Sequence, residues 1–277
     1  MNFINCAAKA SPELLKSTLI FWSENSFQHI TSLLRSPNGT TAVLQPFFKE
    51  QLHLYYDEFL NINKMLKQNG LSNAIYNRFI RLNSDFVLLL ERIKYEGFSG
   101  YPVLQQSVFH YIYEGRYINA VLNLKNPVGN VLITAYFAPF YNQNINCFYN
   151  QMYFWSIIGA MHPSLLMGNN AFYNAINGYA KEFLTEVTNS FNLINFRLTS
   201  LKRPVKPKAL SEIFYEFCAL NDGFLEFLGE IKRNSAKIFI SPMVTRLPAT
   251  FYAGVDHQIA EHTLVRTINE NIAKILK

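Results

Sequence analysis

Residues 153–167, YFWSIIGAMHPSLLM, align without gaps with residues 20–34, IFWSENSFQHITSLL. Both stretches contain Phe-Trp-Ser, and in both a histidine stands seven residues after the tryptophan. His29 follows Trp22 in this way, and His162 follows Trp155. A pattern of this length that returns within one chain indicates an internal repeat.

Three further matches follow in the same order along the chain. They pair FFKEQLHLYYDEFLNIN (47–63) with YAKEFLTEVTNSFNLIN (179–195), RLNSDFVLLLERIK (81–94) with ALNDGFLEFLGEIK (219–232), and His110-x-x-x-Glu114 with His257-x-x-x-Glu261. Because collinear matches rarely arise by chance, we interpret the chain as a tandem duplication.

The matched segments have helical periodicity. Leu15, Leu19, Trp22, His29 and Leu33 fall on one side of a helical wheel, as in an amphipathic helix. Turn signals such as 68–70, 168–170 and 201–208 separate such segments. The expected fold is all-α, with two tandem ferritin-like four-helix bundles related by internal duplication. Their expected bounds are 1–125 and 147–277, with a crossover linker at 126–146.

The repeated histidines and glutamates are the candidate site residues. His110 and Glu114 are one helical turn apart on an apolar face, as are His257 and Glu261. A buried glutamate is costly unless it is paired or binds a metal ion. Two imidazoles and one carboxylate suit iron, manganese or zinc. The predicted metal ligands are therefore His29, His110 and Glu114 in the first half, and His162, His257 and Glu261 in the second.

Other repeated residues receive different interpretations. Trp22 and Trp155 are expected to be ordinary core residues. Glu50 and Glu182 also correspond, but they lie opposite the apolar stripe and are only additional candidate ligands. His53 and His262 have no histidine at the corresponding position in the other copy and are expected to be solvated.

These residues resemble an uncharacterised bacterial family of tandem ferritin-like bundles, a domain-of-unknown-function family. Phe21-Trp22, Phe154-Trp155 and the run 256–261, DHQIAE, carry the resemblance, which covers about residues 12–276. It implies a ferritin-like fold with a metal site in the bundle, and it implies no reaction. Dinuclear ferritin-like sites use two Glu-x-x-His motifs, which these helices lack, so one metal ion per half is expected.

Composition and charge narrow the remaining functions. Hydrophobic residues make up 49% and charged residues 16% of the 277 residues, which excludes intrinsic disorder. A net charge of +6 that is spread along the chain is weak support for nucleic-acid binding, and none is expected.

Cellular location and partners follow from the cysteines and the apolar runs. Three widely spaced cysteines, no secretory signal and no long apolar run predict a cytoplasmic protein without a membrane span. The expected partner is a metal ion, iron or manganese by preference, and the oligomeric state stays open. The alternatives are a metal-free helical interaction module with buried His–Glu pairs, and a small-ligand binder with an aromatic interior. Whether the protein is an enzyme stays open.

Overall fold

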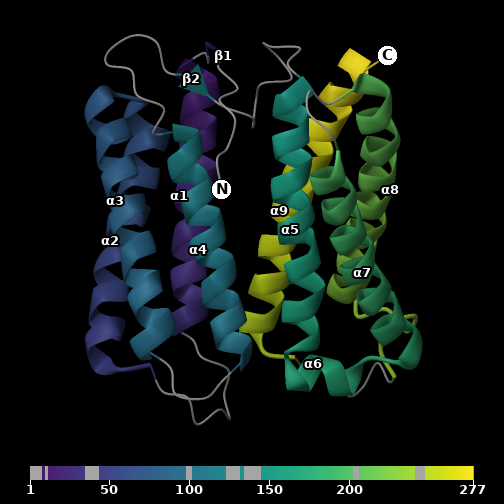
Figure 1. Ribbon diagram of the computed structural model, residues 1–277. Helices are drawn as coiled ribbons and strands as arrows, with labels where there is room; N and C mark the ends of the chain where they lie inside the picture. Colours follow the sequence, from purple (N-terminus) through teal and green to yellow (C-terminus); the bar gives the residue numbers. More distant parts are fainter. Residues whose placement is uncertain are drawn as a thin grey trace. The chain divides into compact units, whose positions relative to one another are not determined.

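A computed structural model describes residues 8–9, 12–34, 44–97, 102–122, 132–133, 145–201, 206–240 and 247–276. These residues are almost entirely helical, which confirms the predicted all-α class (Figure 1). The described residues also include one short pair of antiparallel strands, β1 (Ala8–Lys9) and β2 (Leu132–Ile133). Most of the predicted linker 126–146 lies outside the described residues.

The chain divides into two compact units, and each is described by itself. The first unit is Ala7–Phe137, and the second is Ala138–Lys277 together with Met1–Cys6. Four long helices are described in the first unit: α1 (Pro12–Leu34), α2 (Pro46–Asn69), α3 (Asn73–Arg92) and α4 (Pro102–Leu122). A π-helical turn, η1 (Ile93–Gly97), follows α3.

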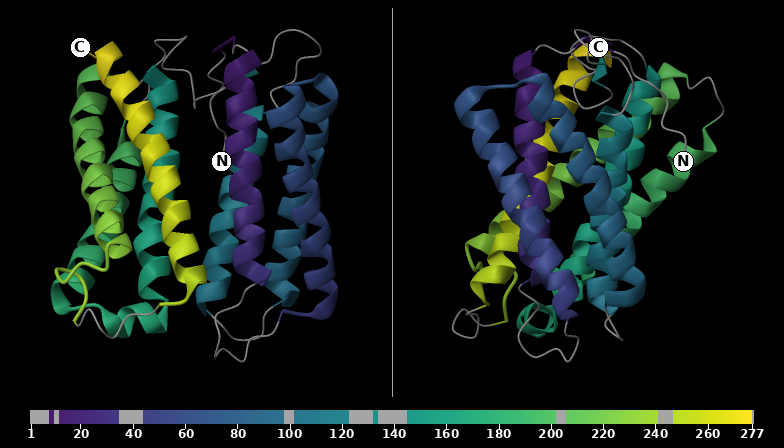
Figure 2. Two further views of the ribbon diagram at one scale, coloured as in Figure 1. Left: turned by 180° about the vertical axis from the view of Figure 1, so that it is seen from behind. Right: turned by 90° about the vertical axis from the view of Figure 1, so that its left-hand side faces the viewer.

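The described part of the second unit also has four long helices. They are α5 (Ile145–Met167), α7 (Gly178–Ser200), α8 (Pro207–Lys232) and α9 (Ala249–Leu276). A short helix, α6 (Asn170–Ala175), lies between α5 and α7 and was not predicted. Successive long helices within each unit run antiparallel (Figures 1 and 2).

Local sequence explains several helix ends. Ser72 and Asn177 each accept a hydrogen bond from a backbone N–H in the first turn of α3 and α7, so they cap these helices. Proline stands in the first turn of α2 and of α8, where its missing N–H carries no cost. Gly70 ends α2 with φ 79°, a conformation that glycine adopts without strain. The predicted turns at 68–70 and 168–170 coincide with helix ends, and the predicted turn at 201–208 falls where α7 ends and α8 begins, with 202–205 outside the described residues.

Aromatic side chains fill the interior of each unit. In the first unit, Phe59 contacts Phe79 with ring centroids 6.0 Å apart. In the second, Phe191 contacts Phe217 at the same distance. Trp22 and Trp155 are buried, each 2% exposed, as expected for core residues. These cores hold α1 beside α4 and α5 beside α9, the two helix pairs that carry the predicted ligands.

Candidate metal centres

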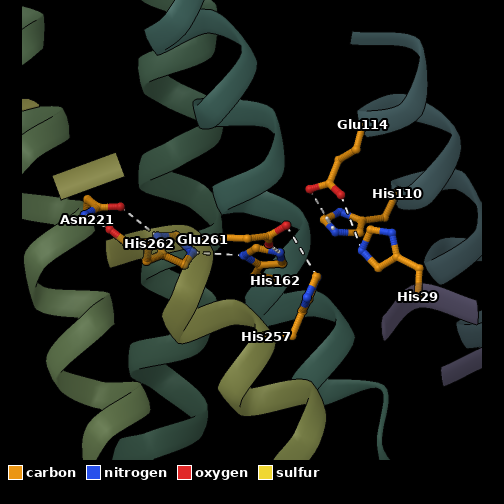
Figure 3. Close-up of polar contacts among 8 residues, drawn as sticks. All are labelled: His29, His110, Glu114, His162, Asn221, His257, Glu261 and His262. Atoms are coloured by element: carbon orange, nitrogen blue, oxygen red, sulfur yellow. Dashed lines mark hydrogen bonds and ion pairs between the residues drawn. The ribbon is translucent and has the colours of Figure 1, made fainter. Parts of the chain in front are cut away.

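The first unit brings its three predicted ligands together (Figure 3). His29 comes from α1, whereas His110 and Glu114 stand one turn apart on α4. Nε2 of His29 lies 3.3 Å from one carboxylate oxygen of Glu114, and Nε2 of His110 lies 3.5 Å from the other. One ligand atom from each of the three residues lies within 4.8 Å of the others. All three side chains are buried.

The second unit places its three predicted ligands in the same relationship. His162 comes from α5, and His257 and Glu261 come from α9. Nε2 of His162 lies 3.1 Å from one oxygen of Glu261, and Nε2 of His257 lies 3.4 Å from the other. Glu261 and His162 are fully buried, and His257 keeps slight exposure.

These separations match those between ligands that share a metal ion. Nitrogen and oxygen ligands about 2.1 Å from an ion are about 3.0 Å apart at a right angle and about 3.4 Å apart at a tetrahedral angle. A charge-assisted hydrogen bond between imidazolium and carboxylate is shorter, at about 2.7–2.9 Å. The four His–Glu distances, from 3.1 to 3.5 Å, lie in the range of shared ligands. The buried His/Glu groups could therefore hold a metal ion.

Electrostatics in the second unit favours the ligand form of histidine. Burial lowers the pKa of His257, Glu261 opposes this shift, and nearby His162 adds to it. A metal ion binds neutral imidazole, so a lowered histidine pKa keeps the ligand available near neutral pH.

Glu50 and Glu182 stand apart from these groups. Both side chains are exposed, Glu50 on α2 and Glu182 on α7. Neither belongs to the group of His and Glu residues whose ligand atoms lie close together. Their helical-wheel positions, opposite the apolar stripe, anticipated this exposure.

The prediction that His262 is solvated was wrong, whereas exposed His53 agrees with the prediction. His262 is 2% exposed. Its Nε2 lies 2.9 Å from Nδ1 of His162, and its Nδ1 lies 2.7 Å from Oδ1 of Asn221 on α8. Phe224 packs edge-on against its ring. The prediction failed because a helix residue next to the apolar face is covered when a neighbouring helix packs against it.

Some neighbours of the two sites were not predicted from the sequence. Tyr111 stacks on His29, with ring centroids 3.8 Å apart and an interplanar angle of 20°. Asn83 on α3 donates a hydrogen bond of 3.0 Å to the carbonyl oxygen of Gly115, the residue after Glu114. Asn221 binds the carbonyl oxygen of His262 in the same way at 3.1 Å. The repeated Leu-Asn dipeptide was the signal for this contact.

Comparisons with known proteins identify no family for this chain. The chain matches no family model, no curated protein and no solved structure. No helix in the described part of the chain combines the length and apolar character needed to cross a membrane.

Proposed function

We propose that this protein binds metal ions, one in each unit. The ligands are His29, His110 and Glu114 in the first unit, and His162, His257 and Glu261 in the second. The observation that carries the proposal is the pair of imidazole nitrogens at each buried carboxylate, 3.1–3.5 Å from its two oxygens. One carboxylate balances only one imidazolium, whereas a divalent cation uses both imidazoles in their neutral form.

Iron or manganese is the proposed metal. Two imidazoles and one carboxylate, without a thiolate, suit both ions and leave coordination positions open for water or another small molecule. Zinc is also compatible with this donor set. The open positions would permit redox or oxygen chemistry on a bound iron ion, and we assign no reaction.

The proposal includes a ferritin-like origin by tandem duplication. Its support is that counterpart residues make counterpart contacts in the two units. The Asn83 and Asn221 side chains bind the carbonyl oxygen after each site glutamate. The histidine of the first long helix in each unit lies beside the glutamate of the last. The number of long helices in each described unit is the one that the resemblance implies, whereas their antiparallel succession is that of an up-and-down bundle without the long crossover of ferritin-like folds.

Metal-dependent melting tests the proposal against the metal-free alternative. Protein purified without a histidine tag is stripped with chelator and melted at pH 7 with Mn²⁺, with Zn²⁺, or with Fe²⁺ under anaerobic conditions. We expect the melting temperature to rise, because an ion at a hundredfold excess over its dissociation constant stabilises by about 2.7 kcal/mol.

The Glu114→Gln/Glu261→Gln double variant is the control, because a carboxamide has the shape of a carboxylate and is a poor ligand. Its melting temperature should not respond to the ions. A melting temperature of the unaltered protein that is indifferent to all three ions would reject metal binding and leave the buried His–Glu pairs as structural contacts.

A further inference from the structure

The second unit contains a chain of polar contacts that continues beyond its proposed ligands. From Glu261 it passes to His162, then to His262, and ends at Asn221 (Figure 3). All four side chains are buried. The proposed metal site itself uses only Glu261, His162 and His257, so His262 and Asn221 have no role in it as ligands.

The end of this chain at Asn221 determines where the protons lie. A backbone carbonyl oxygen can only accept hydrogen bonds, so the amide nitrogen of Asn221 must face the carbonyl oxygen of His262, 3.1 Å away. The amide oxygen of Asn221 then faces Nδ1 of His262 at 2.7 Å. That oxygen only accepts, and Nδ1 of His262 therefore carries a proton.

The proton on His262 fixes the next one. With Nδ1 protonated, Nε2 of neutral His262 is an acceptor, and Nδ1 of His162 must donate to it across 2.9 Å. Nε2 of neutral His162 is left with its lone pair on the side of Glu261, 3.1 Å from a carboxylate oxygen. Nε2 of His162 and the carboxylate oxygen of Glu261 are then both acceptors, and a cation held between them removes their repulsion. Reversing the chain would instead turn two acceptors toward each other at Asn221, where no cation is proposed, so the reversed arrangement is disfavoured.

The first unit cannot contain the same chain. In the sequence match the counterpart of His262 is Gly115, which has no side chain. A Cβ atom added at Gly115 would lie 2.4 Å from Cγ2 of Val87, so α3 leaves no room for a histidine there. Asn83, the counterpart of Asn221, instead donates to Asn119 at 2.9 Å as well as to the Gly115 carbonyl.

We infer that Asn221 and His262 are positioning residues that hold the proton of His162 on Nδ1 and present its Nε2 to the metal, at the second site only. This inference rests on the proposed metal binding. The ring nitrogen opposite a metal-bound one commonly donates to a fixed acceptor, which sets the tautomer and raises the basicity of the ligand. Here the acceptor is a second histidine, whose own tautomer is fixed by an asparagine.

Nuclear magnetic resonance of the metal-free protein tests the proton positions directly. Long-range ¹H–¹⁵N spectra of ¹⁵N-histidine-labelled protein distinguish protonated from unprotonated ring nitrogens. We expect Nδ1 of both His162 and His262 to be protonated and Nε2 of His262 to be unprotonated. An unprotonated Nδ1 on His162 would overturn the inference, whether or not the protein binds metal.

Two variants at position 262 test the consequence for the metal. His262→Gln keeps an oxygen acceptor near the place of Nε2, whereas His262→Leu removes it. Both are made in a Glu114→Gln background, so that only the second site is measured by Zn²⁺ titration. We expect His262→Leu to weaken Zn²⁺ binding by about 10–100-fold and His262→Gln to stay near the parent. In His262→Leu the proton of neutral His162 should also move to Nε2, toward Glu261.

The outcomes separate this inference from the proposed function. Absence of Zn²⁺, Mn²⁺ and Fe²⁺ binding by the unaltered protein would reject the proposed function, and the spectra would still decide the proton positions. Binding that is equal in His262→Leu, His262→Gln and the parent would overturn the positioning role while metal binding stands. The spectra of the unaltered protein still decide the proton positions if His262→Leu does not fold.

Discussion

Asn63 on α2 donates hydrogen bonds from Nδ2 to Oγ of Ser23 on α1, at 2.9 Å, and to the carbonyl oxygen of Ile20, at 3.1 Å. In the second unit, Asn195 on α7 makes the same two contacts with Ser156 and Tyr153 on α5, at 3.1 and 3.4 Å. Ser23 and Ser156 are the serines of the repeated Phe-Trp-Ser. Two separate sequence matches therefore meet in space within each unit.

This contact predicts a stability loss that does not involve the metal sites. Asn63→Leu should lower the free energy of unfolding by about 1–3 kcal/mol, because the buried Ser23 hydroxyl loses the donor Asn63 and the carbonyl oxygen of Ile20 loses one of its donors. Asn195→Leu should cost less, because Asn195 is only half-buried and its hydrogen bonds are longer. Urea unfolding measures both, and exposed Asn61→Leu on α2 is the control. A loss in Asn63→Leu no larger than in Asn61→Leu would contradict this account.

Two glycines in helices predict opposite effects of the same substitution. A Cβ atom at Gly159 would lie 2.7 Å from the ring of Phe191, whereas a Cβ at Gly223 meets nothing within 4 Å. Gly159→Ala should destabilise by about 1–3 kcal/mol through overpacking of the core. Gly223→Ala should stabilise by up to about 1 kcal/mol, because alanine favours the helix more than glycine does.

Thermal and urea unfolding of the two alanine variants check these signs. Because both changes add one methyl group inside a helix, their difference reports the packing around Gly159. Stabilisation by Gly159→Ala would show that α5 does not approach α7 as closely as described.

The pH dependence of the metal-free protein separates the two interpretations of the His–Glu groups. Burial lowers the folded pKa of His257 below the unfolded value of about 6.5. The unfolded chain then binds more protons between these two values. The contribution of His257 to the free energy of unfolding is therefore full above about pH 6.5 and is lost as pH falls toward its folded pKa.

A His–Glu ion pair predicts the opposite slope. An ion pair would raise the folded histidine pKa, so its stabilisation would be full below about pH 6.5 and lost as pH rises through the raised value. Urea unfolding of chelator-stripped protein between pH 5 and 8 gives the sign. Comparison with His257→Gln isolates the contribution of this residue, and exposed His53→Gln is the control. A stability that decreases toward pH 8 in the unaltered protein, and does so less in His257→Gln, would support the ion pair.

The sequence was sufficient for the helices and for the approach of the matched histidines and glutamates. Apolar periodicity and turn residues determine helix positions locally, and an i, i+4 spacing places His110 beside Glu114 without tertiary information. The repeat added the third residue of each group, because His29 and His162 recur at matching positions of the two copies, as the two His–Glu pairs do.

The surroundings of the sites could not be predicted, because they depend on how the helices pack. The burial of His262 requires α8 to cover the flank of α9 and Asn221 to stand opposite the imidazole. The stacking of Tyr111 on His29 requires a particular approach of α1 to α4. The short helix α6 begins at Asn170 and is capped by Asn169, a residue that the sequence indicated only as part of a turn.

Metal stoichiometry of the glutamate variants tests the central claim most directly. Protein is purified without a tag or chelator, loaded with Mn²⁺ or anaerobic Fe²⁺, desalted and analysed for metal by mass spectrometry, with circular dichroism confirming the helical content. We expect one ion per unit in the unaltered chain and in the His53→Gln control. Glu114→Gln and Glu261→Gln should each lose about half the metal, because each carboxylate is proposed to hold its own ion. The double variant should bind none, and stoichiometric metal in a folded double variant would contradict the assignment of these glutamates as ligands.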